Sequence, residues 1–241
     1  MTKTIKFKID EDMKFLSPIV PASKALPDWY RNAPQSMSDA PAWDSGTFKT
    51  CMPFFDAMTQ GYILPLWADL YVAPGPIDEA TGLSNPTFTW NPMGVTLTIT
   101  SHRREQTAGI PAVEQASTGH AFKLISPWVM QTPKDYSVLY VPPLNNRDSR
   151  FEIISGAVCT DEYVNRVNFP FVWNAPHDYE GLIEQGTPIA QIIPYKREAF
   201  EHEIVYMTDK DKVEANAVFN AVTSQFRGAY KKLYRKKSMS R

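Results

Sequence analysis

Two carboxylates stand in the most aromatic stretch of the sequence, residues 51–71. Asp56 and Asp69 are isolated there among phenylalanine, tyrosine, tryptophan, methionine and leucine side chains. A carboxylate in apolar surroundings must find a partner or change its pKa, and ligand pockets combine apolar walls with a few polar groups. The stretch therefore has two interpretations: core packing beneath a sheet, or the wall of a pocket that contains Asp56 and Asp69.

The histidines do not form a metal-binding pattern. They are His102, His120, His177 and His202, and no two of them have the i, i+2 or i, i+4 spacing that metal ligands use. His177 and Asp178 are neighbours, and neighbouring side chains on a strand point to opposite faces. We therefore predict no metal site, and the sequence gives no indication of a cofactor.

Three blocks in the second half of the chain follow one another in an informative order. They are Ile154-Ser-Gly-Ala-Val-Cys-Thr-Asp-Glu-Tyr163, Val167-Asn-Phe-Pro-Phe-Val-Trp-Asn174 and Ile183-Glu-Gln-Gly-Thr-Pro-Ile-Ala-Gln-Ile-Ile193. This order resembles the end of the dUTPase and dCTP-deaminase superfamily. The resemblance covers about residues 122–195 and implies a β-clip fold. It also implies a cleft that Asp161, Tyr163 and Trp173 would line, with Asp161 pointing into it.

The chain departs from that superfamily where hydrolysis takes place. Cys159 stands where the superfamily keeps its catalytic aspartate, and Tyr163 falls one residue late for the tyrosine of the sugar site. Pro142-Pro143-Leu144 replaces the residues that grip the phosphates. Pyrophosphate hydrolysis needs a carboxylate that activates water and donors that hold the phosphate charge. We therefore expect no turnover of dUTP or dCTP.

A second resemblance concerns the whole chain. Its pieces are Pro21-Ala-Ser-Lys-Ala-Leu-Pro-Asp-Trp-Tyr30, Cys51-Met-Pro-Phe-Phe-Asp-Ala-Met-Thr59 and Tyr230-Lys-Lys-Leu-Tyr-Arg-Lys-Lys237. These are similar to a family of proteins without an established activity, encoded by tailed phages, especially those of cyanobacteria, and by some bacteria. That resemblance implies a phage or bacterial protein, located in the host cytoplasm or in the virion.

The prolines define the elements that must position these residues. There are 20 prolines and 11 glycines in 241 residues, and proline neither donates to a sheet ladder nor fits inside a helix. The pattern predicts one all-β domain over residues 1–208, a β-clip or jelly-roll-like body of about ten short strands, with residues 1–50 as an extended N-terminal strap. The expected strands are Ile5–Ile9, Gly61–Val72, Thr87–Trp90, Val95–Ser101, Phe122–Ile125, Ser137–Val141, Glu152–Val158, Arg166–Trp173, Gly181–Ile183 and Ile189–Tyr195.

The last part of the chain, residues 209–241, has a different character. Six apolar residues share one face at helical spacing, namely Ala215, Phe219, Val222, Phe226, Tyr230 and Leu233. They predict one amphipathic helix that packs on the β body or on a partner, with Asp209 or Asp211 as its cap. The basic end, residues 231–241, is interpreted as a solvated helix end. A nucleic-acid arm is the alternative.

Composition limits the classes of function. The net charge is −1, which argues against a general polyanion-binding surface, and no apolar run approaches the about 18 residues of a membrane span. Two cysteines, Cys51 and Cys159, suit a reducing cytoplasm. The resemblance to the β-clip superfamily, whose members form trimers, implies a homo-oligomer, a trimer first, and the surplus of aromatic residues agrees with this. Either the C-terminal helix or the segment Cys51–Tyr71 would lie at the interface.

Two functional hypotheses remain. In the first, the chain is a non-catalytic binding or structural module that contacts a protein or a small ligand. In the second, it is an enzyme for a nucleotide-like or amino-acid-like substrate, with a cleft near Asp56, Asp69, Asp161 and Tyr163.

Overall fold

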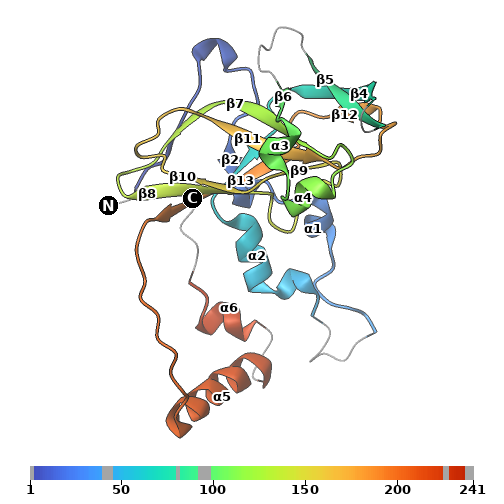
Figure 1. Cartoon of the computed structure of the whole chain (residues 1–241). Helices are drawn as coiled ribbons and strands as arrows, with labels where there is room; N and C mark the ends of the chain where they lie inside the picture. The colour runs from blue at the N-terminus through green and yellow to red at the C-terminus, as the bar shows by residue number, and fades with distance from the viewer. Residues whose placement is uncertain (1–2, 40–45, 80–81, 92–98, 225–227, 237–241) are drawn as a thin grey trace.

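The computed structural model describes residues 3–39, 46–79, 82–91, 99–224 and 228–236. Its body consists of antiparallel strands in three sheets (Figure 1). The first sheet has the order β1 (Lys6–Lys8), β7 (Ala121–Gln131), β11 (Arg166–Trp173) and β9 (Phe151–Ile153), with β6 (Ile99–Ser101) also on β7. The second has the order β10 (Gly156–Val158), β8 (Tyr136–Val141), β13 (Pro188–Lys196), β3 (Tyr62–Pro65) and β2 (Val20–Pro21). The third joins β12 (Gly181–Ile183), β4 (Asp69–Asp78) and β5 (Leu83–Asn91).

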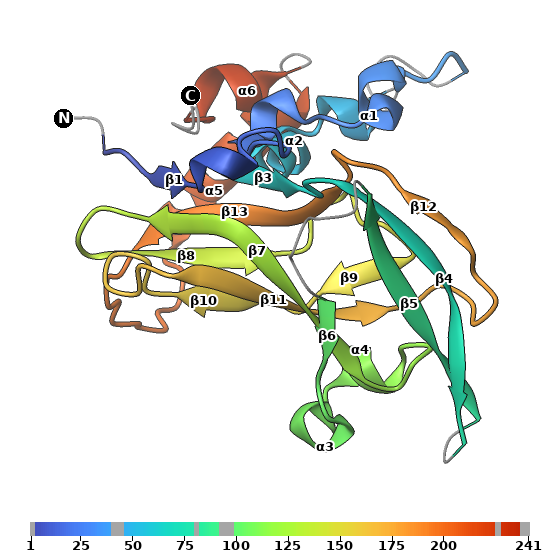
Figure 2. The same cartoon turned by 90° about the horizontal axis from the view of Figure 1, so that it is seen from above.

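The core lies between the first and second sheets. Tyr140 of β8 meets Phe169 of β11 edge to face, with ring centroids 5.2 Å apart. The Tyr140 hydroxyl donates to the sulfur of Met130 on β7 at 3.0 Å. Leu64 and Ile192 add side chains with no exposed surface from the second sheet. The prediction of an all-β body is confirmed, and the third sheet extends from one end of it (Figure 2).

Alternation along the strands explains why they form where they do. In β11, Val167, Phe169 and Phe171 are buried, while Asn168 between them is exposed. A strand places successive side chains on opposite faces, so this pattern buries one face against the other sheet. The predicted bounds of this strand, Arg166–Trp173, agree with the structure.

Other predicted strands differ from the structure. The expected strand Gly61–Val72 is two strands, because the chain between β3 and β4 leaves its ladder: Leu66 exchanges backbone hydrogen bonds with the turn at residues 186–187. The expected strand Glu152–Val158 is also two strands, β9 and β10, which belong to different sheets. Residues 95–98 of the expected strand Val95–Ser101 lie outside the described residues, and the rest is β6.

The N-terminal segment is more than an extended strap. Its strands β1 and β2 join the first and the second sheet respectively. Between and after them lie η1 (Glu11–Met13), η2 (Ala22–Lys24), α1 (Asp28–Asn32), η3 (Phe48–Thr50) and α2 (Met52–Thr59), and two further short helices, α3 (Arg104–Thr107) and α4 (Pro111–Glu114), follow β6. Trp29, Tyr30, Phe48, Phe54 and Phe55 pack together as an aromatic cluster beside the β body.

The C-terminal segment is two helices and not one. Helix α5 (Asp209–Ser224) and helix α6 (Ala229–Leu233) are separated near Gly228, which has a φ of 83°. Gly228 is the N-cap of α6, and glycine adopts this left-handed conformation without strain. The cap also differs from the prediction: Thr208 is the cap, because its hydroxyl accepts from the Asp211 amide while Asp211 accepts from the Thr208 amide. None of the helices in the described chain has the length and apolar character needed to cross a lipid bilayer.

Candidate functional site

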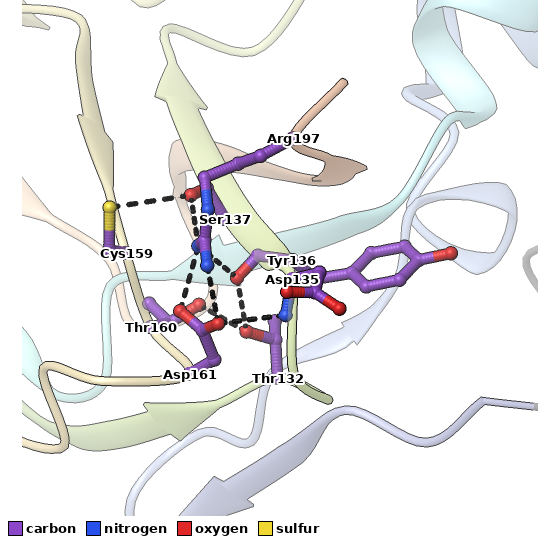
Figure 3. A network of polar contacts seen from close by, with 8 residues as sticks. All are labelled: Thr132, Asp135, Tyr136, Ser137, Cys159, Thr160, Asp161 and Arg197. Carbon is purple, nitrogen blue, oxygen red and sulfur yellow. Dashed lines mark hydrogen bonds and ion pairs between the residues drawn. The ribbon is translucent and has the colours of Figure 1, made fainter. Parts of the chain in front are cut away.

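Asp161 lies in a polar network at one end of the second sheet (Figure 3). Its carboxylate accepts from the two guanidinium nitrogens of Arg197 at 2.7 and 2.5 Å. The backbone amide of Asp135 donates to the same carboxylate at 2.9 Å. Only 3% of the Asp161 side chain is exposed. The carboxylate therefore points into a closed hydrogen-bonded arrangement.

Three segments meet in this network. Arg197 directly follows β13, and it also donates to the Tyr136 carbonyl at 3.0 Å and to the Ser137 hydroxyl at 2.9 Å. The hydroxyls of Thr132 and Thr160 lie 2.8 Å apart and tie the turn after β7 to the loop after β10. The network thus fastens the end of β13 to two turns that are distant in the sequence.

The charge pairing decides what chemistry Asp161 can perform. The hydrogen bond from Arg197, and that from the Asp135 amide, lower the pKa of Asp161 to about 2. A general base works best with a pKa near the operating pH. Asp161 is therefore a poor proton acceptor at neutral pH, and its position suits a structural ion pair. Cys159 is exposed and accepts a long contact of 3.6 Å from the Ser137 hydroxyl.

Asp56 forms a second ion pair, with the C-terminal segment. It lies on α2 and accepts from Arg235 at 2.5, 2.9 and 3.0 Å, which is a bidentate contact. The Arg235 guanidinium also lies 5.5 Å from the ring centroid of Phe55. Only 13% of the Arg235 side chain is exposed. The interpretation of the basic end as solvated does not hold for Arg235, which fastens the tail to α2.

The other predicted site residues have separate surroundings. Asp69 accepts from the backbone amide of Gln185 at 2.7 Å, beside the turn that follows β12. Trp173 is buried in the core and packs edge to face on Phe88. Tyr163 is half exposed, and its hydroxyl accepts from Asn165 at 3.2 Å.

The structure does not bring the predicted carboxylates together. Asp56 lies on α2, Asp69 at the start of β4 and Asp161 on the loop after β10, and each has its own partner. Within the described residues, no hydrogen bond or ion pair joins any two of them. Nor do the described residues contain a group of three or more histidine, cysteine, aspartate or glutamate side chains placed to hold a metal ion.

A groove between the third sheet and the first was not found from the sequence. It has a volume of about 380 Å³ and opens to solvent. The residues that line it are Asn85, Pro86, Thr87, Phe88, Ile99, Ser101, His120 and Phe122. The lining contains no aspartate, glutamate, lysine or arginine.

His120 lines this groove, and its imidazole has a defined hydrogen bond. Its Nδ1 lies 3.0 Å from the Thr118 carbonyl oxygen, which can only accept. In the neutral ring the proton therefore sits on Nδ1, and Nε2 is left as an acceptor. The imidazole also packs on Phe122, with ring centroids 4.8 Å apart. The sequence does not indicate this role, because a histidine that forms a hydrogen bond to a nearby carbonyl needs no particular spacing from other histidines.

Comparisons with known proteins give low similarity. No protein-family model matches the chain, and no curated protein matches it. Among solved structures, the chain is similar to a mutant dUTPase from phage 80alpha of Staphylococcus with dUpNHpp, at 12% identity and a TM-score of 0.33 over 86% of this chain and 91% of that one. A mutant dUTPase of phage phi11 of S. aureus gives 13% identity and a TM-score of 0.26 over 37% and 74%. Similarity at this level carries no information about activity.

Proposed function

We propose that this chain is a non-catalytic structural module that assembles with copies of itself through its C-terminal arm. The arm is defined as residues 198–224, which comprise an extended segment and helix α5. The single observation that carries the proposal is the exposure of large apolar side chains along this arm. Phe200 and Ile204 are each 87% exposed, and Tyr206 is 95% exposed.

The arm holds its apolar residues away from the body. Figure 1 shows α5 clear of the sheets, and Phe219 on this helix is 65% exposed. Single exposed apolar side chains are normal, but a continuous series of them marks an interaction surface. The sequence predicts that the apolar face of this helix packs on the body or on a partner. The body does not cover that face at Phe219, which favours packing on a partner.

Both ends of the arm are fixed to the body. Arg197, one residue before the arm, is paired with Asp161, and Arg235 beyond it is paired with Asp56. Ala229, at the start of α6, is 1% exposed. The arm is therefore a loop held at its two bases. Such a loop presents its apolar residues at lower entropic cost than a free tail would.

The predicted site residues support a non-catalytic role. Asp161 has a pKa of about 2 because of Arg197, and Asp56 is bound by Arg235. Catalytic acids and bases are usually held in clefts with pKa values shifted toward neutrality. We take the trimer, in the cytoplasm of the producing cell, as the first assembly to test. An origin in a phage, and a place in the virion, belong to the same proposal.

Light scattering coupled to size exclusion tests the assembly. We expect an oligomeric mass for the wild-type chain at about 10–100 μM and a monomeric mass after Phe200→Ser, Ile204→Ser and Phe219→Ser together. The matched control is Ile77→Ser on β4, because Ile77 is 66% exposed but lies outside the arm. A monomeric wild-type chain at these concentrations would overturn the proposal, as would an oligomer that the triple substitution leaves intact.

A further inference from the structure

We propose that residues 200–206 of one copy add as a β-strand to the free edge of β1 in a second copy. This inference rests on the proposed function, and it names the surface that the arm would occupy. It follows from three features of the chain: the pattern of the arm, the pattern of β1 and the match between them.

The first feature is the strand-like pattern of the extended segment. Phe200, Ile204 and Tyr206 fall on one face of an extended chain, and Glu201 and Glu203 fall on the other. Isoleucine, valine and tyrosine at 204–206 favour strands. In the described structure, however, residues 198–207 are in no strand and take part in no backbone hydrogen bond. This segment has the side chains of a strand and lacks the ladder that would satisfy its backbone.

The second feature is the free edge of β1. This strand pairs with β7 on one side, and no strand of the described chain pairs with its other side. Phe7 points inward and meets Tyr62 edge to face, at 5.0 Å between ring centroids. Ile5 and Ile9 share that partly buried face, whereas Lys6 and Lys8 are exposed. An unpaired edge is a template for a further strand, and lysines on such an edge discourage unselective pairing.

The third feature is that both faces match in one register. In an antiparallel pair, the numbers of opposite residues have a constant sum, and a sum of 209 places Glu203 against Lys6 and Glu201 against Lys8. The same register places Ile204 against Ile5 and Phe200 against Ile9. Opposite charges therefore meet on one face. On the other face apolar side chains meet at two positions, with His202 against Phe7 between them. Lys6 and Lys8, which discourage pairing with other strands, therefore favour pairing with this acidic segment.

The exchange is also consistent with the position of the arm's base. Lys3 donates to the Tyr136 hydroxyl at 3.1 Å, and Arg197 donates to the Tyr136 carbonyl at 3.0 Å. The start of β1 and the start of the arm are therefore neighbours on one rim of the body. A neighbouring copy that meets the body at this rim therefore has its β1 within reach of the arm.

Charge reversal with rescue tests the pairing. Lys6→Glu with Lys8→Glu should raise the dissociation constant of the assembly at least about tenfold, because two attractive cross-strand pairs become repulsive. Glu201→Lys with Glu203→Lys should do the same. The four substitutions together should restore assembly, since each pair is attractive again. Lys14→Glu with Lys24→Glu is the control for net charge, and it should leave the mass unchanged.

A designed cross-link tests the register. In a Cys51→Ser and Cys159→Ser background, Thr4→Cys and Val205→Cys stand opposite each other at the sum of 209 and should form a disulfide between copies under mild oxidation. Thr4→Cys with Met207→Cys is two residues out of register and should form much less. A disulfide within one copy would mean that the arm closes on its own β1, and this would overturn the exchange.

The outcomes of these experiments distinguish the pairing with β1 from the proposed function on which it rests. A wild-type chain that is monomeric overturns both. A wild-type oligomer that resists the reversal of Lys6 and Lys8, and that gives no cross-link between copies, overturns only the pairing with β1. Loss of assembly in both charge variants without rescue in the quadruple variant would also overturn the pairing, because it would reveal two independent surfaces.

Discussion

The β body and the C-terminal arm use the same kinds of side chain in opposite ways. In the body, Leu64, Trp67 and Ile192 have no exposed surface. In the arm, Phe200, Ile204 and Tyr206 are almost fully exposed. Burial of a large apolar side chain stabilises by about 1.5–3 kcal/mol, and an exposed one contributes nothing of this kind. The comparison shows that the body is stabilised within one chain, while the apolar residues of the arm can stabilise only a contact with something else.

The ion pairs that hold the arm differ from those within it. The pair of Asp161 and Arg197 is fixed by three further hydrogen bonds: Asp161 accepts one from the Asp135 amide, and Arg197 donates two, to the Tyr136 carbonyl and the Ser137 hydroxyl. Within α5, the pair of Lys210 and Glu214 is exposed and 3.9 Å long. Exposed pairs of this kind contribute about 0–1 kcal/mol. The firm contacts of the arm therefore lie at its bases.

The largest difference between body and arm should appear on truncation of an apolar side chain. Leu64→Ala leaves a cavity in the core, and we expect it to lower the free energy of unfolding by about 2–5 kcal/mol. Phe219→Ala on the arm should change it by about 0.5 kcal/mol or less, because that ring is mostly exposed. Chemical denaturation, at a concentration where the chain is monomeric, measures both. Equal losses would show that Phe219 packs on the body in solution.

A fall in pH should destabilise the ion pair at the base of the arm and the start of helix α5 in different ways. The pKa of Asp161 is lowered by Arg197 to about 2, below its value in the unfolded chain, so the ion pair stabilises the fold at neutral pH. This contribution is complete above about pH 4 and is lost as the pH falls from about 4 to 2. Between these values, the melting temperature of Asp161→Asn should fall less steeply than that of the wild type.

Asp211→Asn is the control for this comparison. The hydroxyl and amide of Thr208 lower the pKa of Asp211 too, but these contacts lie in the exposed start of α5. Loss of the Asp211 carboxylate should loosen the start of helix α5. The melting temperature of the body should stay unchanged across the same pH range. A parallel shift in both variants would mean that the arm and the body unfold as one unit.

Strands that depend on local alternation could be predicted from the sequence. The bounds of β11 and β12 agree with the prediction, because the first alternates between buried and exposed residues and the second is a short apolar segment between turns. The break between β3 and β4 could not be predicted, since it depends on the turn at residues 186–187 that pairs with Leu66. Gly228 indicates that the C-terminal segment is divided into two helices. The prediction of a single helix used only the spacing of the apolar residues and did not take this glycine into account.

The partners of the predicted carboxylates depend on the fold. The apolar stretch around Asp56 and Asp69 correctly indicates that each needs a partner, but not which one, and the resemblance that singled out Asp161 does not name its partner either. Arg197 is 36 residues from Asp161, and Arg235 is 179 residues from Asp56. The sequence therefore identified residues with unusual surroundings. It could not separate a catalytic carboxylate from one that an arginine holds in place.

The smallest expected effect concerns Gly228 and helix α6, at the second base of the arm. Gly228 has a φ of 83°, and a Cβ added there would meet no atom of the described residues within 4 Å, so we expect Gly228→Ala to cost mainly the backbone strain, about 1–2 kcal/mol. Because α6 is held mainly by Arg235 and by burial of Ala229, this strain should shift the balance toward a detached α6. We expect amide exchange in residues 229–236 to become about five- to thirtyfold faster, since this is the population change that such an energy produces. The melting temperature should not change, because the body does not contain the strained residue. Unchanged exchange would mean that contacts beyond the Arg235 pair hold α6, and a lower melting temperature would mean that α6 is part of the cooperative core.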